Sequence, residues 1–216
     1  MPSTTFGNLP QEKKKRFVEA ALLEFAAHNF ETASINVVIK KLNMARGSVY
    51  QYFENKLDLW LSLKAHCDQI KLSYIQSVNR FDFPDFWSYY RALYARGIDF
   101  DLEQPVCSRF LYRVAYRETS EEVSDYIKKW KEDANEMFNQ WVEYEKVQGA
   151  INIEIPAQLA AHFMMSMSIS IADFLHNRYN EFQKQNETGS NVPEQEVAFL
   201  KGYVAEMVSL LQKAMA

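Results

Sequence analysis

The chain has few cysteines, the residues on which disulfide-rich proteins and many zinc-binding proteins depend. Its 216 residues include only two cysteines, Cys67 and Cys107, and neither belongs to a CxxC motif or a His–Cys spacing. Two isolated cysteines build neither a disulfide framework nor a zinc site, so we expect two buried free thiols in a reducing compartment. A chain of this length buries enough apolar surface to fold without disulfides or a bound metal.

Long hydrophobic stretches are also lacking. No run of ~18 uninterrupted apolar residues occurs, so we expect no transmembrane helix. The first residues, MPSTTFGNLPQEKKKR, contain no apolar core of a signal peptide, and the expected location is therefore cytoplasmic. Because the chain has no Gly-rich phosphate loop, no G-x-S-x-G motif and no supported Cys–His arrangement, we predict no catalytic site, no enzyme and no cofactor.

Positive charge is scarce overall but concentrated at one end. The formal net charge is −4, which alone argues against a general nucleic-acid binder. Residues 1–56, however, contain eight basic and five acidic residues, giving +3, whereas residues 57–216 contain 16 basic and 23 acidic residues, giving −7. This segregation favours attraction of a phosphate backbone to the N-terminal part. The basic cluster 13–16 opposes the dipole of its own predicted helix, so it has either an external phosphate partner or a solvated surface role.

Residues 34–56, SINVVIKKLNMARGSVYQYFENK, have the pattern of two short helices joined by a tight turn. Ser34 is a preferred N-cap, and we expect its hydroxyl to accept a hydrogen bond from the first helical turn. Asn43 tolerates left-handed geometry and marks the turn. Gly47 weakens the second helix by roughly 1 kcal/mol relative to Ala, which a close approach to a phosphate or a base would explain. The pattern predicts a helix-turn-helix, whose second helix enters a DNA groove.

Val38 to Leu59 resembles the signature of TetR-type bacterial transcriptional regulators. The shared residues are Arg46, Gly47, Ser48, Val49, Tyr50, Tyr52, Phe53, Lys56 and Leu59. The chain departs from the signature over residues 42–45, Leu-Asn-Met-Ala, where Ala, Gly, Val and Ser are usual. Ala45 lacks a hydroxyl that could cap the recognition helix or touch a phosphate. The resemblance is sharp over residues 10–60 and rests on length and helicity beyond them.

The outward-facing pattern and the resemblance together provide the candidates for DNA contact. We expect Arg46, Ser48 and Gln51 to reach base edges. Tyr50 and Lys56 match positions that contact phosphates in the family, although packing inside the small domain is the competing interpretation for Tyr50. The full candidate set is Ser34, Arg46, Gly47, Ser48, Tyr50, Gln51 and Lys56.

Helical periodicity predicts an all-α protein of about nine helices. We expect a three-helix helix-turn-helix domain over residues 1–54 and a larger helical bundle for effector binding and dimerisation over 55–216. A helix over about residues 55–80 would join the two domains. The bundle would contain helices over about 84–96 and 156–185, and another after residue 193. The helix over 156–185 is apolar on nearly all sides. With the last helix, it is expected to form a four-helix bundle in a homodimer, as the resemblance also implies.

The resemblance further implies an effector pocket in the second domain, for an apolar or aromatic small molecule. Arg109 and Arg113 could supply a charged partner, but exposure on the surface is the expectation for both. His162, Asp173 and His176 lack further ligands, so no metal site is predicted. The large side chains that are candidates for the pocket wall, each also compatible with ordinary core, are Trp87, Tyr90, Tyr94, Phe110, Trp130, Met137, Trp141, Phe163 and Met167.

These expectations converge on a dimeric repressor that binds a palindromic operator in double-stranded DNA and is released by a small-molecule effector. The alternative is a helical-bundle ligand carrier or enzyme that keeps the motif without binding an operator.

Overall fold

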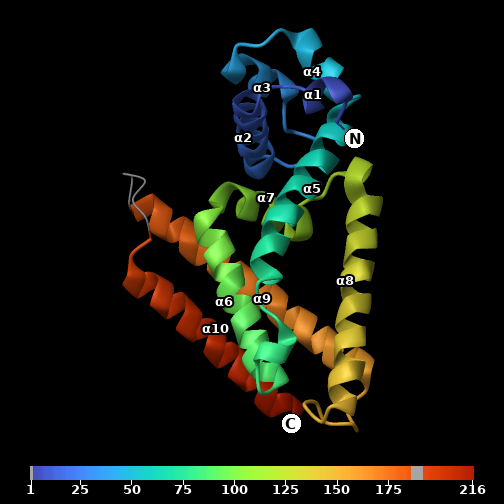
Figure 1. The fold of residues 1–216 in the computed structure, drawn as a ribbon, viewed down its shortest axis with the longest axis vertical. Coiled ribbons are helices and arrows are strands. Elements are labelled where there is room, and N and C mark those ends of the chain that lie inside the picture. Colours follow the sequence, from blue (N-terminus) through green and yellow to red (C-terminus); the bar gives the residue numbers. More distant parts are fainter. Residues whose placement is uncertain (1, 186–191) are drawn as a thin grey trace. The chain divides into compact units, whose positions relative to one another are not determined.

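The computed structural model describes residues 2–185 and 192–216 and is all helical over those ranges, with no strand, as predicted. Figure 1 shows the order of the helices along the chain. They are α1 (Thr4–Gly7), α2 (Gln11–Ala27), α3 (Ile35–Leu42), α4 (Arg46–Tyr52), α5 (Lys56–Ile75), the 3₁₀ helix η1 (Arg80–Asp82), α6 (Phe86–Glu103), α7 (Pro105–Tyr116), α8 (Glu121–Val147), α9 (Ala157–Gln185) and α10 (Glu194–Met215).

Several helix limits differ from the sequence prediction. Helix α5 ends at Ile75 instead of near residue 80, and η1 follows it with the Asn79 side chain as its cap. Helix α6 continues to Glu103, beyond the predicted end near residue 96. No proline interrupts it before Pro105, which occupies the first turn of α7, a position that proline favours.

The short helix α1 was not predicted, and it is fastened to α4. The Ser3 hydroxyl accepts a hydrogen bond from the Phe6 amide at 3.2 Å and donates one to the Gln51 carbonyl oxygen at 2.6 Å. The Phe6 ring lies 4.9 Å from the Phe53 ring and 5.6 Å from the Phe17 ring. These contacts hold α1 against the end of the helix predicted to enter DNA.

The chain divides by packing into two compact units. Unit 1 comprises residues 1–72 and 104–128, and unit 2 comprises residues 73–103 and 129–216. Helix α5 therefore begins in unit 1 and ends in unit 2, and α8 also continues from one unit into the other. The functional boundary expected between residues 54 and 55 stays a prediction, because compact packing and function are different properties.

Unit 1 is built around an aromatic core in which α2 packs against α3 and α7. Phe30 meets Trp60 edge to face at 5.8 Å, and Trp60 meets Phe110 in the same way at 6.2 Å. Arg113 is half-buried and donates to the carbonyl oxygens of Ala26 and Ala27 at 3.0 Å each, so it caps the C-terminus of α2. This capping role corrects the expectation that Arg113 would be a surface residue.

Unit 2 is a bundle in which α10 packs along α6 and against α9 (Figure 1). Its core includes Trp87, whose indole N–H donates to the Ala150 carbonyl oxygen at 3.0 Å. Arg80 and Glu145 form a two-pronged ion pair, with N···O distances of 3.0 and 3.2 Å. The Glu145 carboxylate is almost fully buried, so this ion pair is a structural element of the unit.

The described parts of the chain hold neither a membrane-spanning helix nor a metal cluster. None of the helices there combines the length and apolar character needed to cross a membrane. Within the same residues, no group of three or more His, Cys, Asp or Glu side chains is placed to hold a metal ion. His162, in particular, is exposed on α9.

Candidate nucleic-acid interface and effector-binding core

The turn between α3 and α4 has the geometry that the sequence predicts. Asn43 adopts the left-handed conformation, with φ 51° and ψ 46°, and its N–H bonds back to the end of α3. The Met44 N–H donates to the Ile39 carbonyl oxygen at 3.1 Å, which closes the turn. An Asn side chain tolerates this backbone conformation at low cost, so the two helices are joined without a glycine.

Helix α4 presents one buried and one exposed face. Val49 is 1% exposed and Phe53, which follows the helix, is 4% exposed, so both anchor the helix in unit 1. Gly47, Tyr50 and Gln51 are exposed and share the opposite face, since residues three and four positions apart are neighbours on a helix. Among the described residues, and apart from the neighbouring backbone of its own helix, nothing lies within 4 Å of a Cβ built on Gly47. Packing among these residues therefore does not account for the glycine.

The two helix starts in the motif lack side-chain caps. Ala45 occupies the N-cap of α4 and cannot supply a hydroxyl, as its identity implies. Ser34 occupies the N-cap of α3, but its hydroxyl makes no capping bond, which corrects the expectation for this residue. Its amide instead donates to the Glu24 carboxylate at 2.8 Å. The half-buried Ser34 hydroxyl thus remains without a role in capping α3.

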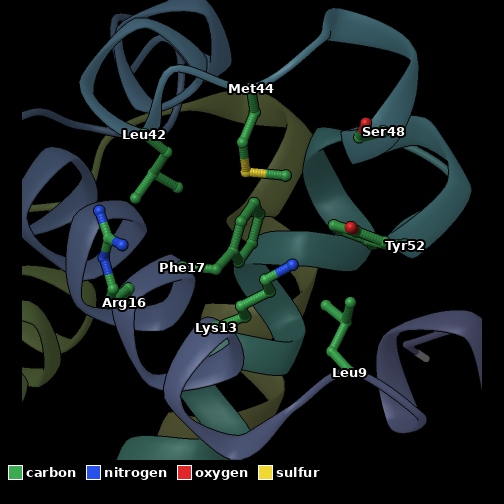
Figure 2. A pocket seen from close by; sticks show the side chains of 8 residues that line it. All are labelled: Leu9, Lys13, Arg16, Phe17, Leu42, Met44, Ser48 and Tyr52. Carbon is green, nitrogen blue, oxygen red and sulfur yellow. The ribbon is translucent and has the colours of Figure 1, made fainter.

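A basic groove lies beside α4, with a volume of about 360 Å³. Figure 2 shows Lys13 and Arg16 on the α2 side of this groove, Ser48 and Tyr52 on the α4 side, and Phe17 between them. The other two cations of the cluster have partners of their own. Lys14 donates to the Gly7 carbonyl oxygen, and Lys15 lies 4.0 Å from Glu19. The spacing of Lys13 and Arg16 (i, i+3) already indicated a shared helix face, but not its position beside α4.

Lys56 has an internal position in unit 1. Its amine donates to the Glu31 carbonyl oxygen at 3.0 Å and lies 4.9 Å from the centre of the Phe30 ring. Burial lowers the pKa of Lys56, against the opposing effect of nearby carboxylates including Glu118 and Glu122. The structure therefore gives Lys56 a role in holding α5 to the rest of unit 1, and contact with a phosphate stays a prediction. The Arg46 side chain lies outside the described atoms, so its contact with a base also stays a prediction.

The predicted effector-binding residues fall into three groups. Trp87 and Tyr90 are in the core of unit 2, and Tyr94, Trp141 and Met167 pack against that core. Trp130 is half-buried, and Met137 and Phe163 are exposed by 43% and 42%. Phe110 belongs instead to the core of unit 1, beside Trp60, and does not share the aromatic cluster of unit 2.

A polar trio lies within the aromatic cluster. The Tyr90 and Tyr94 hydroxyls are 3.2 Å apart, and both lie within hydrogen-bond distance of the Ser168 hydroxyl. Ser168 in turn donates to the Met164 carbonyl oxygen at 2.9 Å. Burial raises the pKa of both tyrosines, so they remain neutral hydroxyls that can donate or accept. Unit 2 thus combines an aromatic wall with polar groups fixed on α6 and α9.

The chain is similar to one protein family and to several solved structures. Residues 17–63 match the family model described as bacterial regulatory proteins of the tetR family. A TetR family transcriptional regulator from Chloroflexus aurantiacus J-10-fl is 23% identical, with a TM-score of 0.78 over 100% of this chain and 98% of that chain. The FadR regulator of Bacillus subtilis, solved with stearoyl-CoA, is 13% identical, with a TM-score of 0.65 over 94% and 99% of the two chains. No curated protein matches the chain.

A third solved structure contains nucleic acid. The TetR family regulator CifR, complexed with a 26-base-pair operator duplex, is 13% identical, with a TM-score of 0.65 over 94% of this chain and 96% of that chain. The structural similarities establish the fold over the whole length, and the family match covers the residues that build α3, the turn at Asn43 and α4. Residues 17–63 therefore form a helix-turn-helix segment of the tetR family type, and the chain as a whole has the fold of the TetR-family regulators.

Proposed function

We propose that the chain is a dimeric repressor that binds a two-fold symmetric operator and is released from it by a small molecule. The observation that carries this proposal is the exposed face of α4, formed by Gly47, Tyr50 and Gln51, beside the cationic groove of Lys13 and Arg16. Helix α4 would enter the major groove with Gln51 toward the bases, while the two cations and the Tyr50 hydroxyl contact phosphates.

Two adjacent helices of unit 2 support a dimer. Helix α9 exposes Leu159 and Phe163, which are one turn apart, and also Ile169, and α10 exposes Phe199 and Leu210. Exposed apolar residues at helical spacing on neighbouring helices are typical of an interface. A second copy related by a two-fold axis would cover them and would place two α4 helices on half-sites about 34–36 Å apart.

The dimer proposal makes a prediction at Gly202. This residue is exposed on α10, and a Cβ added to it meets nothing within 4 Å in the subunit. A Gly202→Arg variant should therefore fold normally but sediment as a monomer, because the new side chain would intrude on a covered face. Gly97→Arg on α6, where a Cβ also meets nothing, is the matched control and should remain dimeric. A Gly202→Arg dimer as stable as the unmodified one would contradict this choice of interface.

The effector would bind in the aromatic cluster of unit 2, where the hydroxyls of Tyr90, Tyr94 and Ser168 could orient an apolar or aromatic molecule. FadR of Bacillus subtilis was solved with stearoyl-CoA, a ligand with a long apolar tail. Because α5 is continuous from the DNA-binding unit into unit 2, it is the direct route for coupling. Release requires that the effector bind the DNA-free state more tightly than the DNA-bound state.

Selection of random duplexes by the purified protein, followed by sequencing, tests this function. The proposal predicts a motif of two inverted half-sites. The alternative, a ligand carrier or enzyme that retains the motif, predicts no enriched motif. Recovery of unselected sequences at physiological salt, where sequence-independent electrostatic binding is weak, would therefore overturn operator binding.

A further inference from the structure

The two cysteines form a pair within unit 1. Cys67 lies on α5 and Cys107 on α7, and their two thiol groups lie close enough to interact. Both are free thiols, with exposed fractions of 0% and 5%. They are far apart in the sequence and neither belongs to the DNA-contacting face or to the aromatic cluster of unit 2. The proximity of the two cysteines therefore has no role in the proposed DNA binding or effector binding.

One of the two thiols can be reached from solvent. Cys107 lines a groove of about 640 Å³ formed by α1, α2, α5 and the start of α7. The exposed residues Gln11, Lys15 and Leu23 also line this groove, so it opens to the surface. Cys67 does not line the groove and is fully buried beside Cys107. A small reactant in the groove would therefore meet Cys107 first.

The surroundings make the two thiols chemically unequal. Cys107 is the third residue of α7, and the positive end of a helix dipole stabilises a thiolate there. The interaction with Cys67 lowers the pKa of Cys107, against the opposing effect of burial. The same interaction and burial raise the pKa of Cys67, which keeps its proton. Cys107 is thus suited to attack an oxidant first, and Cys67 is suited to react afterwards with the oxidised Cys107 sulfur.

We propose that Cys107 and Cys67 are a peroxide-reactive pair that closes an intrachain disulfide between α5 and α7. The Cys107 thiolate attacks one oxygen of hydrogen peroxide, the O–O bond breaks, and the departing hydroxide takes a proton to form water. The Cys67 sulfur then attacks the resulting sulfenic acid, the S–S bond forms, and the S–O bond breaks to release a second water. Two thiols lose two electrons in total, and the peroxide gains them.

This chemistry concerns unit 1 alone and does not rest on operator binding. It does place a covalent link on the helix that follows α4, since α5 begins at Lys56 and carries Cys67 in its middle. The link would tie the helix that leaves the DNA-binding motif to α7 in the same unit.

The test treats the reduced full-length protein with hydrogen peroxide and follows free thiols and intact mass. The expected product is a chain with no covalent bond to another chain, which has lost both thiols and two hydrogen atoms. Cys67→Ser should stop at the Cys107 sulfenic acid, which dimedone traps as a mass adduct. Cys107→Ser should slow thiol loss by about tenfold or more, because the remaining thiol is buried and protonated. Helical circular dichroism and thermal unfolding verify that both variants are folded.

Three results would overturn the proposal. One is equal oxidation rates for the two single variants, which would remove the distinction between an attacking and a resolving thiol. Another is a wild-type product joined between chains instead of within one chain. The third is a wild-type protein that keeps both thiols under peroxide while glutathione in the same tube is oxidised.

Discussion

Replacing Arg80 by alanine should lower the free energy of unfolding by about 3–5 kcal/mol, because it strands a buried carboxylate. The guanidinium holds Glu145 through two bonds of 3.0 and 3.2 Å, and its own pKa is raised by those bonds. The Glu145 side chain is only 4% exposed, so its carboxylate would lose its cation at a largely buried position. Chemical denaturation of the purified variant, monitored by circular dichroism, measures the effect.

Two controls separate this mechanism from a general loss of charge. Lys129→Ala removes a cation of α8 whose partner, Asp133, is exposed, and should cost less than about 1 kcal/mol. The double variant Arg80→Met, Glu145→Met replaces both charges with apolar groups and should recover most of the stability lost in Arg80→Ala. A double variant no more stable than Arg80→Ala would show that the stranded carboxylate is not the cause.

Replacing Lys13 and Arg16 by alanine together should weaken binding to every duplex, by a factor on the order of 50 at 0.1 M salt. Both cations line the groove beside α4, so their loss removes two phosphate contacts. The slope of log affinity against log salt concentration should become shallower by about 2. Fluorescence-anisotropy titrations of a labelled duplex at several salt concentrations measure both quantities.

The chain offers a control that removes the same charge from the same helix. Lys14 bonds to the Gly7 carbonyl oxygen and Lys15 lies beside Glu19, and both line the groove that contains Cys107. A Lys14→Ala, Lys15→Ala variant should therefore change the affinity and the salt slope much less. Equal losses in the two double variants would mean that net charge acts at long range and that the groove beside α4 has no particular role.

The helix-turn-helix is the part of the fold that sequence reasoning predicts most completely. Apolar periodicity locates α2 and α3, and Asn43 supplies the left-handed turn. On α4, Gly47, Tyr50 and Gln51 are exposed as predicted, whereas Ser48 is half-buried. These features depend on residues close together in the chain. Local propensity and helical spacing are therefore sufficient to predict them.

Contacts between distant residues were not predictable in the same way. Arg113 caps α2 across 87 positions, and Lys56 bonds to Glu31 across 25. The pairing of Cys67 with Cys107, like the position of Phe110 in unit 1, follows from how α5 and α7 pack. Sequence also failed to predict the hydrogen bonding of Ser34. Its residue type correctly indicates the N-cap position of α3, but its hydroxyl does not make the capping bond.

The exposed face of α4 is proposed to select DNA sequence, and duplex selection with a Gln51→Ala variant measures this selection. Gln51 is exposed and could pair with adenine, whereas Tyr50 is expected to contact phosphate. Gln51→Ala should change base preference at corresponding positions of the two half-sites. Tyr50→Phe should lower affinity for all sequences and leave the motif unchanged. An unaltered motif with uniformly weaker binding by Gln51→Ala would contradict the account.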